Sequence, residues 1–409
     1  MAYDDLKKLS YFSRNDYLTE YERRFTSPDA VHLDFHIGEH QAFFVPVTEV
    51  TELVFNILKI DKQVLIISKR LPKVALSQYS YKCLIDEIVL TNKIEGVQSS
   101  RREIGDVLGE LHRQSERKNK AGRFRGIVTH YSKLMSQEQI PTETCQDIRN
   151  LYDELVLPEV KAENRAHLPD GMMFRKDSVD IYNTAGKSIH AGLYPEGKII
   201  DAMEKALLFL HNDSVNELYR TCLFHYLLEY IHPFYDGNGR LGRFLLSYSL
   251  SQQFEPLLAY RISETIEEKK AAYYECFRLC NHSRNLGDLT PFLIMMLGII
   301  LQSVKELEKS LKSRADSLEH YSGAINLLPY SANRKMKELY EALIQASLFD
   351  ENGVSASELE DRLQCSYNTL NKYLRQINSM GMLAEKNNGK IRYYSVLLEA
   401  MDQVIMRSQ

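Results

Sequence analysis

The spacing of hydrophobic residues along the chain is that of a mostly helical protein. Apolar side chains recur three and four residues apart over most of the sequence, for example at Met203, Leu207 and Leu210. This spacing places them on one face of an α-helix. Strand-like alternation is rare, and we find neither a fixed-period repeat nor a low-complexity tract. The pattern predicts a mainly α fold.

One segment departs from the helical pattern. Residues 178–194, SVDIYNTAGKSIHAGLY, carry β-favouring side chains on both sides of an Asn-Thr-Ala-Gly turn. Such a pattern predicts a short β-hairpin, or flap.

The C-terminal part of the chain has a different organisation. A charged stretch over residues 305–333 predicts a helical linker that ends at a domain boundary. Amphipathic segments follow, two of which begin after the typical helix N-caps Ser355 and Ser366. Residues 388–389, Asn-Gly, then give a strong hairpin-turn signal. Three helices closed by a two-stranded wing resemble a winged helix-turn-helix domain, expected over residues 334–409.

The composition is that of an ordinary globular protein. The 409 residues are 44% hydrophobic and 26% charged, and the net charge of −4 gives no overall attraction to nucleic acid or anionic membranes. The N-terminus lacks a secretory-signal pattern, and the longest apolar run, residues 292–301, is about half the length of a membrane-spanning helix. Six scattered cysteines without metal-ligand spacing fit a reducing compartment. We expect a cytoplasmic protein that does not bind membranes.

The stretch IHPFYDGNGRLGR, residues 231–243, combines residue types that bind and transfer phosphate groups. The proline after His232 cannot continue a helix, so the histidine lies at a helix end that faces a loop. There it is placed to take a proton from an attacking hydroxyl group. Each residue taken singly has an ordinary structural explanation. A turn, however, needs neither three glycines nor two arginines behind a histidine.

The loop after this histidine is suited to phosphate groups and a divalent cation. Backbone N–H groups of residues 237–239, Gly-Asn-Gly, can face a ligand at the start of the next helix, where the helix dipole favours anions. Arg240 and Arg243 are three residues apart and can hold phosphate oxygens. Asp236 offers the hard oxygen ligand that Mg²⁺ prefers.

The order His-Pro-Phe-x-Asp-Gly-Asn-Gly-Arg-x-x-Arg resembles, without a departure, the signature of the Fic family. Members of this family mostly transfer AMP from ATP to a protein hydroxyl group, and their fold is a helical bundle with a β-hairpin flap. The similarity extends over roughly residues 84–301, about half of the chain. It implies that His232 is the general base, that Asp236 is the Mg²⁺ ligand and that Phe234 anchors the loop in the core. The phosphates would be held by Gly237, Asn238, Gly239, Arg240 and Arg243.

Weaker matches flank this motif. Residues 273–281, followed by GDLTPF, are similar to the family segment that lines the adenine pocket, so Tyr274 and Asn281 are candidate base contacts. The alternative is that tyrosine at helical spacing belongs to the core. The flap falls where the family pairs a target segment with its hairpin as an added strand. The target-binding residues would be Lys187, Ser188, Ile189, His190, Ala191 and Gly192.

The segment TNKIEG, residues 91–96, resembles the inhibitory motif of the Fic class with an N-terminal inhibitory helix, expected here near residues 84–97. A carboxylate at Glu95 can pair bidentately with Arg243 and so remove that arginine from the γ-phosphate of ATP. The triphosphate would then bind in a non-productive pose. The alternative is a surface glutamate on an amphipathic helix.

These observations predict a protein adenylyltransferase that uses ATP and Mg²⁺ and is auto-inhibited by Glu95. Its target would be another protein or the enzyme itself, and a homodimer is one of the states open to it. Two rivals remain: the reverse reaction, which removes AMP from a modified protein, and a transcription regulator whose Fic core senses nucleotide. The winged helix lacks a basic surplus, so DNA binding and protein docking both stay open. The expected domains are an N-terminal helical region (1–83), a Fic core (84–304), a charged linker (305–333) and the winged helix (334–409).

Overall fold

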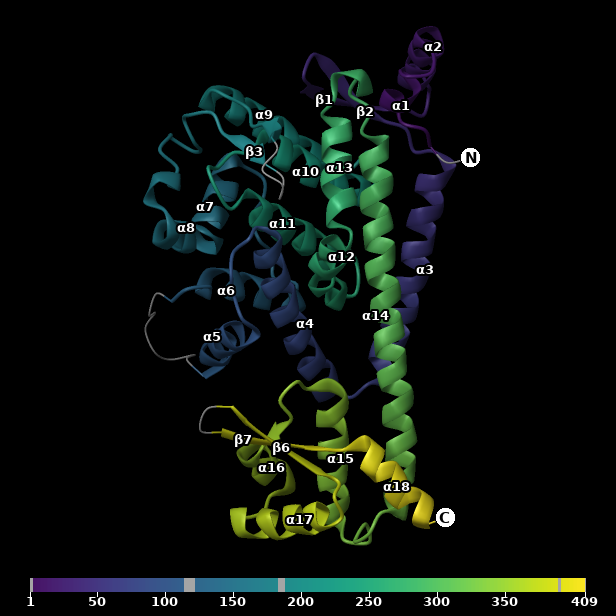
Figure 1. The fold of residues 1–409 in the computed structure, drawn as a ribbon, viewed down its shortest axis with the longest axis vertical. Coiled ribbons are helices and arrows are strands. Elements are labelled where there is room, and N and C mark those ends of the chain that lie inside the picture. Colours follow the sequence, from purple (N-terminus) through teal and green to yellow (C-terminus); the bar gives the residue numbers. More distant parts are fainter. Residues whose placement is uncertain (1–2, 114–121, 183–187, 389–390, 409) are drawn as a thin grey trace. The chain divides into compact units, whose positions relative to one another are not determined.

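The computed structural model describes residues 3–113, 122–182, 188–388 and 391–408. The fold is mainly helical, as predicted (Figure 1), and the chain divides into two compact units. The larger unit contains residues 1–61 and 84–305, and the smaller unit contains residues 62–83 and 306–409.

The boundaries of the two units differ from those of the four segments that we expected from the sequence. Residues 1–61 pack with the expected catalytic core, whereas residues 62–83 belong to the smaller unit. The larger unit ends at Lys305, one residue after the expected end of the core. The stretch that we expected as a separate linker is largely the second half of one continuous helix, α14 (Thr290–Ala324).

The larger unit is built on two buried helices, α10 (Glu217–Ile231) and α11 (Asn238–Gln253). Most of their side chains are buried on all sides, which is typical of helices at the centre of a fold. Helix α10 packs against α11 and against α9 (Glu196–Leu210). The other helices of this unit are α1 (Leu6–Leu9), α2 (Arg14–Phe25), α5 (Arg101–Arg113), α6 (Arg125–Lys133), α7 (Cys145–Leu155), α8 (Leu157–Glu163), α12 (Ile262–Glu268) and α13 (Lys270–Cys280), with short 3-10 turns at Leu134–Ser136, Arg165–His167, Pro256–Tyr260 and Ser283–Asn285.

Three long helices contribute residues to both units: α3 (Thr48–Arg70), α4 (Lys73–Ile94) and α14. By length and composition alone, residues 290–327 are long and apolar enough to cross a membrane. Of their most apolar window, 56% is buried within the protein, as is usual for a core helix. The expectation that the chain does not bind membranes stays a prediction.

The N-terminal region contains a hairpin where we expected only helices. Strands β1 (Val31–Ile37) and β2 (His40–Phe44) pair antiparallel around Gly38, whose φ of +60° favours glycine. Side chains of β1 are alternately buried and exposed. The alternation in VHLDFHI is a strand signal, but it is short and surrounded by helical patterns.

The predicted flap is present as a two-stranded hairpin. Strand β3 (Asp180–Tyr182) pairs antiparallel with β4 (Ser188–Ala191), and Ile181 lies opposite His190. Residues 183–187, and therefore the candidate Lys187, lie outside the described residues. The side chains of the candidates Ser188, Ile189 and His190 lie outside them too.

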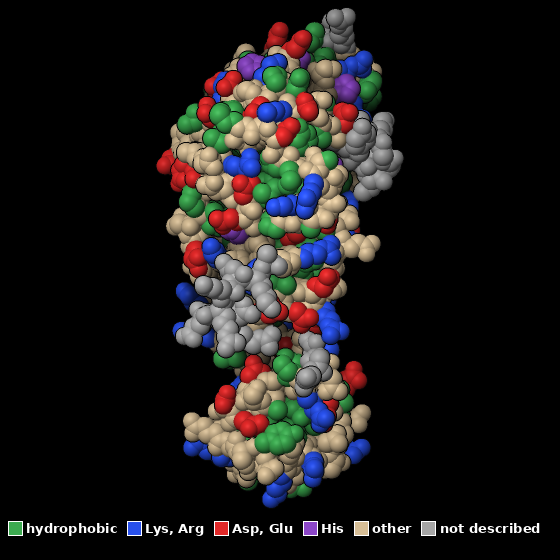
Figure 2. Space-filling model, turned by 90° about the vertical axis from the view of Figure 1, so that its left-hand side faces the viewer, with side chains coloured by type: hydrophobic (Ala, Val, Ile, Leu, Met, Phe, Trp, Pro, Cys, Tyr) green, Lys and Arg blue, Asp and Glu red, His purple; other side chains and the backbone are tan. Residues whose placement is uncertain are grey.

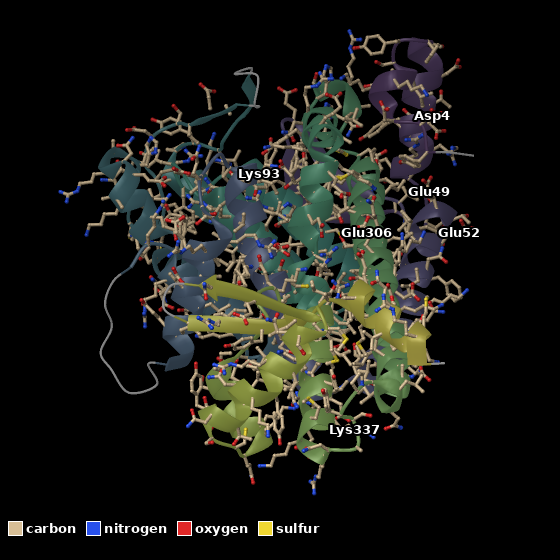
Figure 3. The ribbon with its side chains drawn as sticks, turned by 60° about the horizontal axis from the view of Figure 1, so that its bottom comes forward. Asp4, Glu49, Glu52, Lys93, Glu306 and Lys337 are labelled. Atoms are coloured by element: carbon tan, nitrogen blue, oxygen red, sulfur yellow. The ribbon has the colours of Figure 1, made fainter. Side chains whose placement is uncertain are left out.

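The smaller unit contains helices and a three-stranded sheet in the order β5-β7-β6. The side chains of Ser355 and Ser366 cap α16 and α17, as predicted. The short strand β5 and helix α18 were not expected. The order of elements is that of a winged helix-turn-helix, and this assignment stays a prediction. The elements are a turn at Ile325–Leu327, α15 (Arg334–Phe349), which carries the Lys337 labelled in Figure 3, β5 (Val354–Ser355), α16 (Ala356–Leu363), α17 (Tyr367–Ser379), β6 (Leu383–Asn388), β7 (Ile391–Val396) and α18 (Leu398–Ser408).

Charge is mixed on the face of the molecule that Figure 2 shows. On the face that Figure 2 shows, Lys and Arg side chains are interspersed with Asp and Glu side chains. This distribution agrees with the small net charge of −4.

Candidate active site

His232 is the residue at which helix α10 ends. Its backbone is in the left-handed conformation (φ 53°), which costs a non-glycine residue about 1–2 kcal/mol. Its N–H still donates to the carbonyl oxygen of Leu228 (2.9 Å). The left-handed turn takes the chain out of the helix and into the loop of residues 233–237. The structure thus places His232 at a helix end beside a loop, as the sequence predicted.

The loop is fixed from two sides. The buried Phe234 ring stacks on Tyr152, with 3.6 Å between ring centroids, and meets Phe174 edge-on. The Asn238 side chain accepts a hydrogen bond from the N–H of Phe234 (2.9 Å) and donates one to its carbonyl oxygen (2.8 Å). The Asn238 side chain therefore closes the loop. Only the backbone N–H of Asn238 therefore remains for the phosphate contact that we predicted for this residue.

The N-terminus of helix α11 meets this loop at Gly237. The φ of Gly237 is +83°, and a Cβ there would lie 2.6 Å from Cγ1 of Val156, so glycine is required on both counts. The first N–H groups of a helix have no partner within it, and they attract anions. A Cβ on Gly239 would overlap Oε1 of Glu95. A carboxylate therefore already lies where the sequence predicts a phosphate group.

Glu95 forms an ion pair with Arg243, as the sequence predicted. Its Oε1 lies 2.8 Å from Nη1 of the arginine, whose side chain is 1% exposed. The pair is not bidentate, however, because Arg243 turns its other nitrogens to Thr91: Nε donates to Oγ1 (2.8 Å) and Nη2 to the carbonyl oxygen (3.1 Å). Burial alone would raise the pKa of Glu95, but Arg243, Arg240 and His232 outweigh it and lower that pKa below its ordinary value. The carboxylate is thus held charged.

The end of helix α4 is fastened to the helices beside it. The helix ends at Ile94, so Glu95 lies in the turn just after it and not on the helix that we expected. Nζ of Lys270 donates to the carbonyl oxygen of Ile94 (3.0 Å). Lys93, labelled in Figure 3, pairs with Glu267 (3.0 Å). These contacts hold residues 91–96, the segment for which the sequence predicts an inhibitory role, at the start of α11.

Arg240 has a partner that the sequence did not reveal. Its Nη1 lies 2.8 Å from Oε2 of Glu159 on α8, and both side chains are almost fully buried. Burial raises the pKa of Glu159 to about 7, against the opposing effect of Arg240. Among the described residues, Nε and Nη2 of Arg240 make no hydrogen bond, although Nη2 is 3.6 Å from Oδ1 of Asp236. We expected Arg240 to hold phosphate, and these two nitrogens are its remaining donors.

Asp236 lies in the loop with a partly exposed carboxylate. A third of its side chain (34%) is accessible, and Oδ2 is 3.6 Å from Nδ1 of His167. No group of three or more His, Cys, Asp or Glu side chains in the described ranges could hold a metal ion. Mg²⁺ is usually bound by one or two carboxylates together with substrate phosphates. A single, partly exposed carboxylate beside a helix end that is predicted to bind phosphate fits this mode.

The two candidate adenine contacts have different surroundings. Tyr274, on α13, lies near Glu95 and Arg243. Burial and then Glu95 raise its own pKa. Asn281 caps the end of α13, and its Oδ1 accepts a hydrogen bond from the Tyr226 hydroxyl (2.5 Å). In the described part of the chain, no hydrogen bond joins Asn281 to residues 232–243. An adenine-binding role for either residue stays a prediction.

Glu229 is a largely buried carboxylate (14% exposed) that we did not identify from the sequence. It lies one turn before His232 on α10, with Oε2 3.9 Å from Nδ1 of the histidine. Its Oε1 makes no hydrogen bond within the described ranges. Burial, and then the negative charge of Glu95, raise the pKa of Glu229 to about 8. The Glu-x-x-His spacing, which puts both side chains on one helix face, is a signal that would have found it.

Comparisons with known proteins point to one family. Residues 143–250 match the model of the Fic/DOC family. The chain is 24% identical over 192 residues to protein adenylyltransferase fic-1 of Caenorhabditis elegans, covering 45% of this chain and 35% of the relative. It is 29% identical over 143 residues to protein adenylyltransferase Fic of Nematostella vectensis, covering 34% of this chain and 30% of the relative. It thus spans about a third of the length of these curated relatives.

A solved structure shares the fold. A Fic family protein from Desulfovibrio desulfuricans G20 superposes with a TM-score of 0.52 at 22% identity. The match covers 86% of this chain and 96% of that chain.

Proposed function

The chain contains a Fic domain and is a Fic-family protein, and from this we propose that it is a protein adenylyltransferase, which transfers AMP from ATP to a hydroxyl side chain of a target protein or of itself. The observation that carries the proposal is the meeting of two helix ends. His232 ends α10, five residues further on Gly237 begins α11, and Asp236 and Arg243 flank that beginning. His232, the proposed general base, thus lies beside the helix end that we propose as the polyphosphate site.

The reaction follows from these groups. The target hydroxyl oxygen attacks the α-phosphorus of ATP while its proton passes to His232. The bond from the α-phosphorus to the bridging oxygen breaks, and pyrophosphate leaves. The first N–H groups of α11, together with Arg243 and the Nε and Nη2 groups of Arg240, would bind the phosphate oxygens. Mg²⁺, held by Asp236, would neutralise negative charge on the nucleotide.

Glu95 would restrain this activity. Its carboxylate pairs with Arg243 and lies against Gly239, so it takes an arginine contact and an N-terminal helix site that the phosphates need. Arg243 can bind phosphate only when Glu95 has moved or turned away. We therefore propose an auto-inhibited enzyme.

The reverse reaction is the second candidate. A quarter of the Glu95 side chain is exposed beside the phosphate site, where a carboxylate can also orient a water molecule. In that case Glu95 is required for activity, whereas in the transfer reaction it restrains activity. A nucleotide-sensing transcription regulator, the third possibility, would need the winged helix to bind DNA.

One experiment separates these functions. The protein is incubated with α-labelled ATP and Mg²⁺, with and without cell lysate, as wild type, Glu95→Gly and His232→Ala. If the protein is a transferase, the wild type labels protein weakly, the Glu95→Gly variant labels it strongly, and the His232→Ala variant does not label it. The labelled product is then returned to wild-type protein. Release of AMP by wild type, and not by Glu95→Gly, would assign the reverse reaction. No label in any reaction, combined with specific DNA binding, would refute both enzymatic functions.

A further inference from the structure

Arg175 is a fully buried arginine next to the catalytic loop. Its guanidinium group binds backbone carbonyl oxygens and no carboxylate is among these partners. Nε donates to His232 (2.8 Å), Nη1 to Asp177 (2.5 Å), and Nη2 to Leu193 (2.8 Å) and Ile231 (3.4 Å).

Two of these carbonyl groups belong to the C-terminal end of α10. The last carbonyl groups of a helix lack partners within it, and the negative end of the helix dipole favours a cation there. Arg175 supplies both hydrogen bonds and charge at the point where His232 lies. A residue in the left-handed region persists only when its surroundings fix it, and the φ of 53° at His232 requires such support.

The same guanidinium group reaches the base of the flap. Leu193, which follows strand β4, accepts a hydrogen bond from Nη2 of Arg175, and its own N–H donates to Ile231 (3.1 Å). The base of the flap and the end of α10 are therefore joined in two ways: by a direct backbone hydrogen bond, and by the hydrogen bonds that Arg175 makes to both.

Gly192 shows how closely these parts approach. A Cβ on Gly192 would overlap Nη2 of Arg175 and would lie 3.1 Å from Cβ of His232. The flap, the arginine and the catalytic histidine thus meet at one residue that has no room for a side chain.

The segment that carries Arg175 is fastened to the loop as well. The backbone N–H of Arg175 donates to the carbonyl oxygen of Pro233 (3.1 Å). The neighbouring Phe174 ring packs edge-on against Phe234 at 5.5 Å.

We propose that Arg175 is a positioning residue that locks the catalytic loop to the base of the flap. A target segment bound along the flap then presents its hydroxyl group within reach of His232. The lock is a property of the fold, and only its effect on transfer rests on the proposed function. In the described part of the chain, Arg175 makes no hydrogen bond to residues 237–243, so we expect its replacement to affect transfer more than ATP binding.

The test replaces Arg175 in the full chain carrying Glu95→Gly. Lysine keeps the charge but loses the planar fork that reaches several carbonyl groups at once. In Arg175→Lys, we expect kcat for auto-modification with α-labelled ATP to fall about tenfold or more, with KM for ATP within about twofold. Methylguanidine should restore part of the rate in Arg175→Ala, which a general loss of stability would not allow.

Arg149 provides the matched control. Its Nη1 donates to the carbonyl oxygen of Met173 (2.8 Å) and its Nε to Asp153 (2.8 Å), so it supports the same segment without touching the catalytic loop. We expect Arg149→Lys to leave kcat near the value of the Glu95→Gly parent. An equal loss in both variants would overturn the specific role of Arg175, as would parental kcat in Arg175→Lys.

Hydrogen exchange tests the lock without any activity. Amide exchange in peptides covering residues 191–194 and 228–234 should rise together in Arg175→Lys and stay unchanged in Arg149→Lys. If Arg175→Lys does not fold, Gly192→Ala disturbs the same junction from the flap side and should show the same joint increase. Exchange that rises in only one peptide, or in neither, refutes the lock. If the Glu95→Gly parent transfers no label, but exchange rises in both peptides of Arg175→Lys, the proposed function is refuted and the lock is not.

Discussion

Removal of the Glu95 carboxylate is the most informative perturbation of this protein. In Glu95→Gly, Arg243 loses the ion pair at 2.8 Å but keeps both hydrogen bonds to Thr91, so its guanidinium group stays oriented toward the proposed phosphate site. Nη1 becomes available to a phosphate oxygen, and the N-terminus of α11 loses the carboxylate against Gly239. We therefore expect auto-modification to increase.

The size of the increase follows from one charge-assisted contact. Such a hydrogen bond is worth about 1.5–3 kcal/mol, or roughly 10- to 150-fold in rate. Because a quarter of the Glu95 side chain is exposed, solvent weakens the pair, and we expect the lower end, about tenfold. The gain should be in kcat more than in KM for ATP, since Glu95 affects the pose of the triphosphate.

The assay is label transfer from α-labelled ATP at several ATP concentrations. Glu20→Gln is the matched control, because it removes a carboxylate that pairs with arginines of its own helix, Arg23 and Arg24 on α2, and not with Arg243. It should leave labelling unchanged. Arg243→Ala should abolish the gain, so that the double variant behaves like Arg243→Ala alone. Equal labelling by wild type and Glu95→Gly at every ATP concentration would refute the inhibitory role of Glu95.

Three further outcomes are expected. His232→Ala should bind an ATP analogue with wild-type affinity in calorimetry while transfer is lost, because a general base acts in the transition state; parallel loss of binding would make His232 a structural residue. Asp236→Ala should keep its melting temperature without ligand but lose the stabilisation that Mg²⁺ and ATP together provide, and unfolding would refute a metal-binding role. Glu229, with its pKa raised from 4.5 to about 8, holds a proton in the folded protein that the unfolded chain releases. Its contribution to stability is complete below about pH 4.5 and is lost as pH rises to about 8. The melting temperature of Glu229→Gln, measured relative to wild type, should therefore increase steadily between these two pH values. A difference in melting temperature that does not change with pH would show that Glu229 does not ionise in this range.

The parts of the site that the sequence predicts are those set by neighbouring residues. The helix end at His232 follows from Pro233, and the start of α11 follows from Gly237, because these depend on local backbone chemistry. The helix before them shows the limit of such reasoning. Ser214 and Glu217 are spaced as a capping box, yet the structure caps α10 with Asn216, which accepts from Leu218 at 3.0 Å. Two polar residues so close together compete for one cap, and packing decides between them.

The parts that the sequence does not predict are contacts between distant segments. Glu159 pairs with Arg240 across 81 residues of sequence, and Arg175 reaches carbonyl groups up to 57 residues away. Backbone carbonyls occur at every position, so an arginine that binds them has no complementary residue type to indicate it. The hairpin at residues 31–44 was missed for another reason: its alternation is confined to seven residues of β1.

The closure of the loop by Asn238 also bears on how long the site survives chemically. An asparagine followed by glycine is the sequence in which a side-chain amide is most readily attacked by the next backbone nitrogen, forming a cyclic imide and then aspartate. In this protein the Asn238 amide is 1% exposed, both its oxygen and its nitrogen bind Phe234, and the peptide to Gly239 is fixed in the first turn of a helix. The amide cannot swing onto the nitrogen of Gly239 while those bonds last. The contacts that shape the proposed phosphate site therefore also protect the peptide between Asn238 and Gly239 from this chemical degradation.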